Sequence, residues 1–539
     1  MKLNTPNRWT GLQGLLLLCS SFVAAVQYGE NHSPVERDED IVAANFPNTN
    51  ETLYSPAFTN PESRLPGFAN GTDGPTDDAT LDLFLRSIAE RNEWVQYKIA
   101  DYTSEEGRPF PYVVLTSPSA GQTPKLRVWV QGGVHGNEPA GDQAVLALLG
   151  KLDADKEWRK SLLERLTITL LPRYNPDGVA YFQRALASNL DPNREHTKLA
   201  REMSRGHKRL LSAFEPHITV DMHEFTGTRP SGAGGKYKHG MDALIAAGKN
   251  LNTHADIRNI SEVLFAAGVG ARIAEKGFRW EPYFTGSSST ADIVLDEAGS
   301  DAKSGRNNYA LAQSVTILCE VRGIRLADQH FQRRVATALN MVGAILDIAV
   351  ENYREVYDTV EDAISKFIES DEPIVLTDYP NPINRTITFV NRETGAIEQV
   401  PVTFLSTTPT TANQTRPRPE AYLIPHTWSE LAARLRDAGV EVETLADGYR
   451  GPVEALTIAS AEVARGYYEG AVQVTVTADT VRKEEFVLPP GSFRVNARQK
   501  NAAFAFVALE PENVDSYVRF NLIPAEVRDE YPIFRIPRR

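Results

Sequence analysis

The stretch that decides the fold is Leu126-Arg127-Val128-Trp129-Val130-Gln131-Gly132-Gly133-Val134-His135-Gly136-Asn137-Glu138. Its first part is an apolar run with the length of a buried strand, and its second part is a glycine-rich turn. Residues 141–152 then have the composition of a helix. Because glycine lets a backbone turn tightly, the stretch predicts a strand that passes through a close turn into a helix. Such a unit is typical of α/β domains.

Two metal-binding side chains lie in this turn. His135 and Glu138 are three residues apart, so both can point at one site, and an imidazole with a carboxylate is a suitable pair for zinc. The pair alone is common by chance. A third ligand is needed, and His223 follows the apolar residues Ile218–Val220, which predict a strand ending at the same edge of the sheet. Three other histidines remain alternatives for the third ligand: His217, His239 and His254.

Polar residues suited to catalysis follow further along the chain. A turn, Asn175-Pro176-Asp177-Gly178, precedes Arg184 and the pair Asn193-Arg194, and arginine can bind a carboxylate or stabilise an oxyanion. Glu320 interrupts an apolar strand, where a carboxylate would suit a general base. Alternatively, the residues from Asn175 to Arg194 are ordinary loop residues and surface arginines, and Glu320 is a strand-end glutamate paired with Arg322.

Strands alternate with helices up to residue 352, and strands dominate after it. We therefore expect an α/β domain over residues 78–352, with a mixed, largely parallel sheet flanked by helices. We expect a linker over 353–373 and a β-rich accessory domain over 374–539. The polar residues 26–77 predict a loosely ordered leader. The expected strands include these runs: Tyr112–Leu115, Leu166–Leu171, Val315–Glu320, Thr386–Val390, Val400–Phe404, Val472–Val476 and Ala503–Leu509.

The N-terminus has the pattern of a secretory signal. Residues 1–25 combine Lys2 and Arg8 with an apolar run and small residues for cleavage, so we expect a secreted, extracellular protein with no membrane segment afterwards. The net charge of −13 argues against nucleic-acid binding, which needs a basic face. Cys319, the one cysteine beyond the signal, cannot form an intrachain disulfide. Six sequons agree with a glycoprotein: Asn31, Asn50, Asn70, Asn259, Asn384 and Asn413.

Taken in order, these motifs resemble those of the zinc carboxypeptidase family, and in particular those of its large bacterial-type members. The resemblance covers roughly residues 80–350, and the ordered set is far more specific than any single motif. It implies a peptidase that hydrolyses C-terminal peptide bonds with a zinc-activated water, one Zn²⁺ per chain and a peptide or protein C-terminus as the partner. The implied roles are zinc binding for His135, Glu138 and His223, general base for Glu320, oxyanion stabilisation for Arg184, carboxylate binding for Asn193 and Arg194, and substrate capping for Tyr309, with Tyr283 as second choice.

Other functions share parts of this pattern. The segment from Gly133 to Glu138 is also close to enzymes of the aspartoacylase and succinylglutamate desuccinylase type, which cleave N-acyl amino acids at the same kind of metal site. An inactive binding protein on the same fold is a further alternative, as is a glycan-binding role for the β-rich tail. The sequence leaves open the preferred C-terminal residue, a pro-segment role for the leader and the oligomeric state.

Overall fold

The computed structural model describes residues 35–59, 74–117, 124–286 and 290–538. The predicted signal peptide, the sequons Asn31 and Asn70, and residues 26–34 and 60–73 of the predicted leader lie outside the described residues. No single helix in the described ranges is long and apolar enough to cross a membrane, although the pair of helices over 331–351 and 353–369, bent by 85°, passes that test together.

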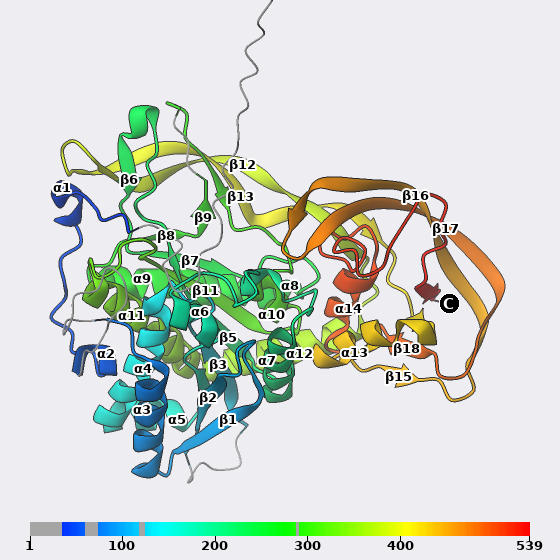
Figure 1. Ribbon diagram of the computed structural model, residues 1–539, viewed down its shortest axis with the longest axis horizontal. Helices are drawn as coiled ribbons and strands as arrows, with labels where there is room; N and C mark the ends of the chain where they lie inside the picture. Colours follow the sequence, from blue (N-terminus) through cyan, green and yellow to red (C-terminus); the bar gives the residue numbers. More distant parts are fainter. Residues whose placement is uncertain (1–34, 60–73, 118–123, 287–289, 539) are drawn as a thin grey trace, which may run out of the picture.

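Residues 78–369, which include the predicted catalytic domain, are called the catalytic body below. Its core is an eight-stranded sheet (Figure 1). Four neighbouring pairs are parallel: β4–β3, β3–β5, β5–β11 and β7–β8. The pairs β1–β2, β2–β4 and β11–β7 are antiparallel. The predicted mixed sheet is confirmed. In spatial order the strands are β1 (Val95–Thr103), β2 (Pro109–Leu115), β4 (Leu166–Leu171), β3 (Leu126–Gln131), β5 (Ile218–Phe225), β11 (Val315–Arg322), β7 (Ala243–Ala247) and β8 (Trp280–Pro282).

Helices cover this sheet and complete its apolar core. The central strands β5 and β11 are buried along their whole length, as expected for strands covered on both faces. Helix α11 is predominantly buried and packs against α4, α9 and β11. The helices are α3 (Asp78–Glu90), α4 (Pro139–Ala154), α5 (Lys156–Leu163), α6 (Pro176–Tyr181), η1 (Pro192–Arg194), α7 (Glu202–Phe214), α8 (Ala255–Ile260), η3 (Ser261–Ala266), α9 (Ala267–Glu275), α10 (Gly305–Ala310), α11 (Phe331–Glu351) and α12 (Tyr353–Glu369).

The boundary after the catalytic body differs from the prediction. Residues 353–369 form helix α12 and not a linker, because Val356, Val360 and Ile364 give it a buried stripe at helical spacing. The long strands β12 and β13, predicted to open the accessory domain, instead join a five-stranded sheet with strands of the catalytic body. In order its strands are β6 (Tyr237–His239), β12 (Ile374–Asn391), β13 (Ile397–Arg416), β10 (Val294–Glu297) and β9 (Phe284–Thr285).

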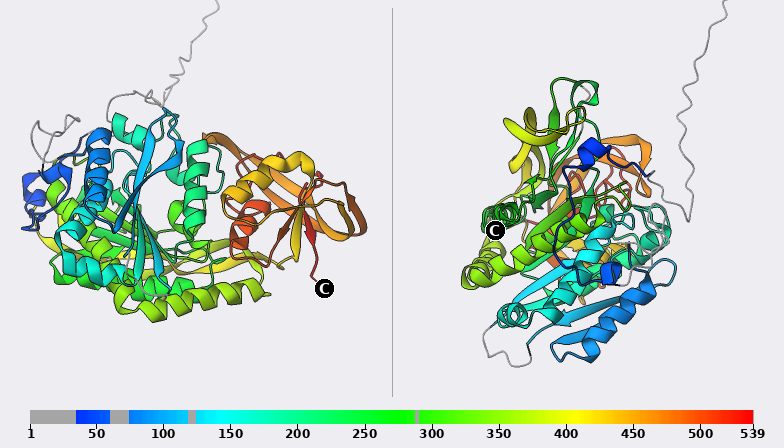
Figure 2. Two further views of the ribbon diagram at one scale, coloured as in Figure 1. Left: turned by 90° about the horizontal axis from the view of Figure 1, so that it is seen from below. Right: turned by 90° about the vertical axis from the view of Figure 1, so that its left-hand side faces the viewer.

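Residues 421–536 form the C-terminal unit, which lies at one end of the catalytic body (Figure 2). It contains a third sheet, six-stranded and wholly antiparallel, and two α-helices, α13 (Ser429–Asp437) and α14 (Ala502–Leu509). The prediction of a strand at Ala503–Leu509 is wrong: this run is a helix buried on every side, and a uniformly apolar run carries no period that separates helix from strand. The strands in order are β15 (Glu443–Thr444), β18 (Phe493–Asn496), β14 (Ala421–Ile424), β19 (Phe534–Ile536), β16 (Tyr449–Tyr468) and β17 (Ala471–Leu488).

The described part of the N-terminal leader is anchored to the catalytic body. It contains α1 (Asp40–Ala43) and α2 (Pro56–Thr59), and it buries Phe46. Asp38 is also buried and accepts a hydrogen bond from Nη2 of Arg322 over 2.9 Å. Residues 35–59 therefore differ from the loosely ordered leader predicted from composition, because several buried apolar side chains and ion pairs hold a mainly polar segment in place.

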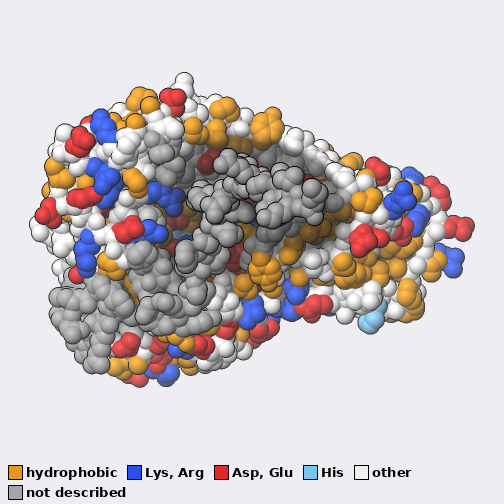
Figure 3. Space-filling model, turned by 45° about the horizontal axis from the view of Figure 1, so that its top comes forward, with side chains coloured by type: hydrophobic (Ala, Val, Ile, Leu, Met, Phe, Trp, Pro, Cys, Tyr) orange, Lys and Arg blue, Asp and Glu red, His pale blue; other side chains and the backbone are white. Residues whose placement is uncertain are grey.

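One face of the described part of the chain carries charged side chains of both signs. On the side drawn in Figure 3, acidic and basic side chains are interspersed over the catalytic body.

Candidate metal centre

His135, Glu138 and His223 meet at the carboxyl edge of the eight-stranded sheet. His135 lies in the turn after β3, Glu138 directly precedes α4, and His223 lies within β5, which pairs with β3. Each side chain is at most 3% exposed. One ligand atom from each lies within 4.8 Å of the others, and within the described ranges no other histidine, cysteine or carboxylate group of three converges in this way.

The shape of the turn explains its glycines. Gly133 has φ +62°, which favours glycine, and a Cβ on Gly136 would lie 1.8 Å from the carbonyl carbon of Gly178. The backbone N–H of Asn175 donates to Gly133 O over 2.9 Å, and Oδ1 of Asn175 accepts from Gly178 N over 2.9 Å. The predicted Asn-Pro-Asp-Gly motif is therefore the support on which the metal-binding turn rests.

The geometry of the three side chains fits a cation. Nδ1 of His135 and Nδ1 of His223 lie 3.2 Å apart, and they face Oε1 and Oε2 of Glu138 at 2.8 and 3.0 Å. The outer nitrogens face carboxylates: Nε2 of His135 lies 3.1 Å from Asp191 Oδ1, and Nε2 of His223 lies 3.2 Å from Asp221 Oδ2. When each ring carries its proton on Nε2, the lone pairs of the two Nδ1 atoms point toward each other. A metal ion between them stabilises this arrangement. Two imidazoles and one carboxylate form a donor set suited to zinc.

Asp191 and Asp221 were not singled out by the sequence analysis. A carboxylate behind each metal-binding histidine orients the ring and raises its basicity. Asp221 could have been inferred, because it lies two residues before His223 and so on the same face of one strand. Nothing local marks Asp191, which is 56 residues from His135.

Glu320 lies on the strand next to His223. The two residues are register partners in the parallel pairing of β11 with β5. The side chain is almost fully buried; burial raises the pKa of Glu320 to about 8, and the nearby negative charge of Glu138 contributes to the rise. A carboxyl group whose pKa lies near neutrality can both take up and release a proton, which suits a general base.

The predicted arginines border the same centre. Nη1 of Arg184 lies 3.2 Å from Oε1 of Glu138, and Nη2 of Arg184 donates to Asp191 Oδ2 over 2.9 Å. Asn193 and Arg194 lie in η1, two and three residues after Asp191. Oδ1 of Asn193 accepts from Gly305 N over 2.7 Å, and Arg194 has a side chain that is 32% exposed. The structure thus brings both arginines to one side of the metal ligands.

The position of Tyr309 does not agree with the predicted role in substrate capping. Its side chain is fully buried, and its hydroxyl lies 2.9 Å from Nε2 of Gln131, which also donates to Asp221 over 3.0 Å. Tyr309 therefore lies behind the metal centre and supports Asp221. The second choice, Tyr283, is half-buried; burial raises its pKa, and it lies within electrostatic reach of Glu320.

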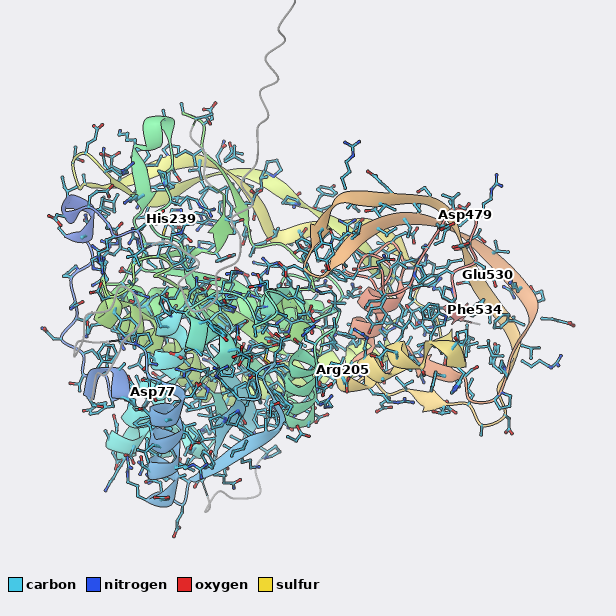
Figure 4. The ribbon with its side chains drawn as sticks, in the orientation of Figure 1. Asp77, Arg205, His239, Asp479, Glu530 and Phe534 are labelled. Carbon is cyan, nitrogen blue, oxygen red and sulfur yellow. The ribbon has the colours of Figure 1, made fainter. Side chains whose placement is uncertain are left out.

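The rival histidines have other partners. His217 lies at the opposite end of β5, where Nδ1 accepts from Arg127 N over 2.9 Å. His254 precedes α8 and its ring accepts from Asp256 N. His239, labelled in Figure 4, lies in β6 among the rings of Phe225, Phe284 and Phe389.

Comparison with known proteins points to one family. The family described as zinc carboxypeptidase matches residues 84–222. Carboxypeptidase 2 of Trichophyton rubrum is 49% identical over 525 residues, which cover 96% of this chain and 97% of the relative. Carboxypeptidase 2 of Trichophyton tonsurans is 50% identical over the same coverage. The solved metallo-carboxypeptidase of Burkholderia cenocepacia superposes with a TM-score of 0.40 at 16% identity, over 52% of this chain and 70% of that one.

Proposed function

The chain belongs to the zinc carboxypeptidase family and is a metallocarboxypeptidase that acts on peptide substrates, and we propose that the residues described above form its catalytic site. His135, Glu138 and His223 would hold one zinc ion per chain. The observation that carries this assignment is the convergence of two imidazoles and one carboxylate, with Glu320 on the next strand.

Each remaining residue has a role that follows from its position. When bound, zinc supplies a Lewis acid that polarises the scissile carbonyl and lowers the pKa of water. Glu320 would take a proton from water and pass it to the leaving amine, because its carboxyl group titrates near neutrality. Arg184 would donate to the developing oxyanion from beside Glu138.

The substrate carboxylate would bind on the side of η1. Arg194 offers a fork of N–H donors that matches a carboxylate. Asn193 uses Oδ1 to accept from Gly305, so its Nδ2 is the group that would donate to the substrate. Tyr283, and not Tyr309, would be the tyrosine that closes over the substrate, because Tyr309 is buried against Gln131.

The test combines metal analysis with substrate choice. The wild-type chain should contain one zinc and release the C-terminal residue of N-blocked dipeptides. Glu320→Gln should retain the zinc and lose at least a thousandfold in kcat, because the ligands stay and the base is lost. Near-normal activity of this variant would show that Glu320 is not the base.

The same screen separates the alternatives. The relatives named carboxypeptidase 2 favour a peptidase over an N-acyl amino acid deacylase. Release of acyl groups from small N-acyl amino acids, with no action on peptides, would reverse that choice. Absence of both zinc and turnover would favour an inactive binding protein.

We also propose that the protein is secreted and glycosylated. The signal pattern of residues 1–25 motivates the first claim, and exposure of four sequon asparagines supports the second: Asn50, Asn259, Asn384 and Asn413. Mass spectrometry of protein from the culture medium should find a chain that begins near residue 26 and carries glycans at these positions. Retention of residues 1–25 in the mature chain would contradict the first claim.

A further inference from the structure

The segment 190–199 connects the metal centre to the C-terminal unit. Asp191 lies at its start, with Oδ1 facing Nε2 of His135 and Oδ2 accepting from Arg184. The backbone N–H of the same Asp191 donates to Oε2 of Glu469 over 2.7 Å. Glu469 belongs to the loop that joins β16 to β17, almost 280 residues further along the chain. One residue is therefore bound to the metal-binding histidine, to the oxyanion arginine and to the C-terminal unit.

The loop of the β16–β17 hairpin lies against this segment, and the hairpin can be followed in Figure 1 as the long orange arch. Nζ of Lys198 donates to the carbonyl oxygen of Glu469. A Cβ on Gly470 would lie 3.6 Å from the methyl groups of Leu190, so the loop packs against this side chain. The loop thus contacts the segment at both of its ends.

Tyr468 precedes Glu469 and lies within electrostatic reach of Arg194. Burial raises the pKa of Tyr468, and the positive charge of Arg194 lowers it. Among the described residues, Arg194 has no carboxylate closer than Oδ2 of Asp191, at 4.0 Å. The guanidinium of Arg194, whose side chain is 32% exposed, therefore has no close carboxylate partner among these residues and can accept one from a substrate. The preceding Tyr467 is 75% exposed.

The segment is also held from its other side. Arg434 of helix α13 donates to the carbonyl oxygens of Lys198 and Leu199. Nζ of Lys198 forms a buried ion pair with Oε1 of Glu195 at 2.5 Å. A short segment with this many partners in a distant part of the chain has little freedom to move.

We propose that the tip of the β16–β17 hairpin completes the subsite for the substrate's terminal carboxylate, with Tyr468 and Glu469 as positioning residues for Arg194 and Asp191. This inference rests on the proposed role of Arg194 in binding that carboxylate. A clamp whose side chains are fixed before the substrate arrives loses less entropy on binding. The C-terminal unit is then part of the active site and not a separate accessory module.

The experiment compares two hairpin variants with a neighbouring control in the full-length enzyme. Tyr468→Phe should raise KM for N-blocked dipeptides about three- to tenfold, because the phenol hydroxyl lies within electrostatic reach of Arg194, with kcat within about twofold. Glu469→Ala should lower kcat as well, because Asp191 also orients His135 and Arg184, and Glu469→Gln should restore most of the loss because its amide oxygen still accepts. Tyr467→Ala is the control and should match the wild type.

A second background separates this inference from the proposed function. In Arg194→Ala, which itself should raise KM strongly, Tyr468→Phe should have no further effect. Wild-type KM and kcat in both Tyr468→Phe and Glu469→Ala would overturn the inference while leaving the role of Arg194 intact. An unchanged KM in Arg194→Ala would overturn the proposed clamp and, with it, the role of Tyr468. Zinc content and thermal unfolding are measured for every variant, and Tyr468→Phe and Glu469→Gln decide the matter if Glu469→Ala does not fold.

Discussion

The catalytic body and the C-terminal unit place buried charges in opposite ways. In the catalytic body the metal ligands come from a turn and a strand of one sheet, and two of them are three residues apart. In the C-terminal unit the central charge is Glu510, fully buried, whose partners Arg416 and Arg535 come from β13 and β19. The first arrangement leaves a pattern in the sequence, and the second is created only by the folded chain.

The two regions are also joined by charges. Arg205 of α7, labelled in Figure 4, forms ion pairs with Asp437 and Glu430 of α13. Lys303 pairs with Asp515 of the C-terminal unit at 3.3 Å. We therefore expect the two regions to unfold together. Removing the metal, or breaking one ion pair in each region, tests whether the C-terminal unit affects metal binding or only stability.

Metal removal should have the largest effect. Dialysis against a chelator should reduce the release of C-terminal residues by more than a hundredfold and lower Tm by several degrees, because an ion bound only by the native state stabilises it. Calorimetry of the two forms checks this. One shifted transition is expected, and added zinc should restore both activity and Tm. Full activity after complete loss of metal would contradict the assignment of His135, Glu138 and His223.

Breaking one buried ion pair in each region should lower the free energy of unfolding by similar amounts but should affect zinc binding differently. Asp142 accepts two hydrogen bonds from Arg173, at 3.0 and 2.7 Å, and lies four residues after Glu138. We expect both Asp142→Asn and Glu510→Gln to lower the free energy of unfolding by about 2 kcal/mol, since each removes one charged partner of a buried arginine that keeps a second carboxylate. Urea unfolding measures this loss.

The metal content of the same two variants distinguishes the regions. Asp142→Asn should also weaken zinc retention, because α4 carries Glu138 at its start. Glu510→Gln should retain zinc as the wild type does. Equal zinc loss in both variants would mean that the C-terminal unit governs the metal ligands directly, and the contrast between the regions would not hold.

Sequence patterns were sufficient for the parts of the fold that depend on neighbours in the chain. The strand, glycine turn and helix around His135 were predictable because apolar period and glycine positions act locally. The burial of Tyr309 could not be predicted, because it depends on packing against Gln131, which is 178 residues away. The long strands β12 and β13 were assigned to the wrong region for a similar reason, since their partners β6 and β10 lie far upstream. Contacts such as Glu469 with Asp191 leave no local pattern at all.

The smallest expected effect is a pH dependence at the boundary between the two regions. Nζ of Lys208 on α7 is buried, donates to Asn308 over 2.6 Å and lies 5.6 Å from the ring of Phe504 in the C-terminal unit. Burial lowers the pKa of Lys208 to about 7.

Between that pH and about 10.4, the ordinary pKa of lysine, the unfolded chain binds a proton that the folded chain does not. The folded state is therefore favoured as pH rises through this range, by up to about 1.4 kcal/mol per pH unit from this group. Urea unfolding at pH 7.5 and 9 should show this gain in the wild type and a smaller one in Lys208→Met, and Lys500→Met, at a half-buried lysine that precedes α14, serves as the comparison. An identical pH dependence in the wild type and Lys208→Met would mean that Lys208 stays charged where the two regions meet.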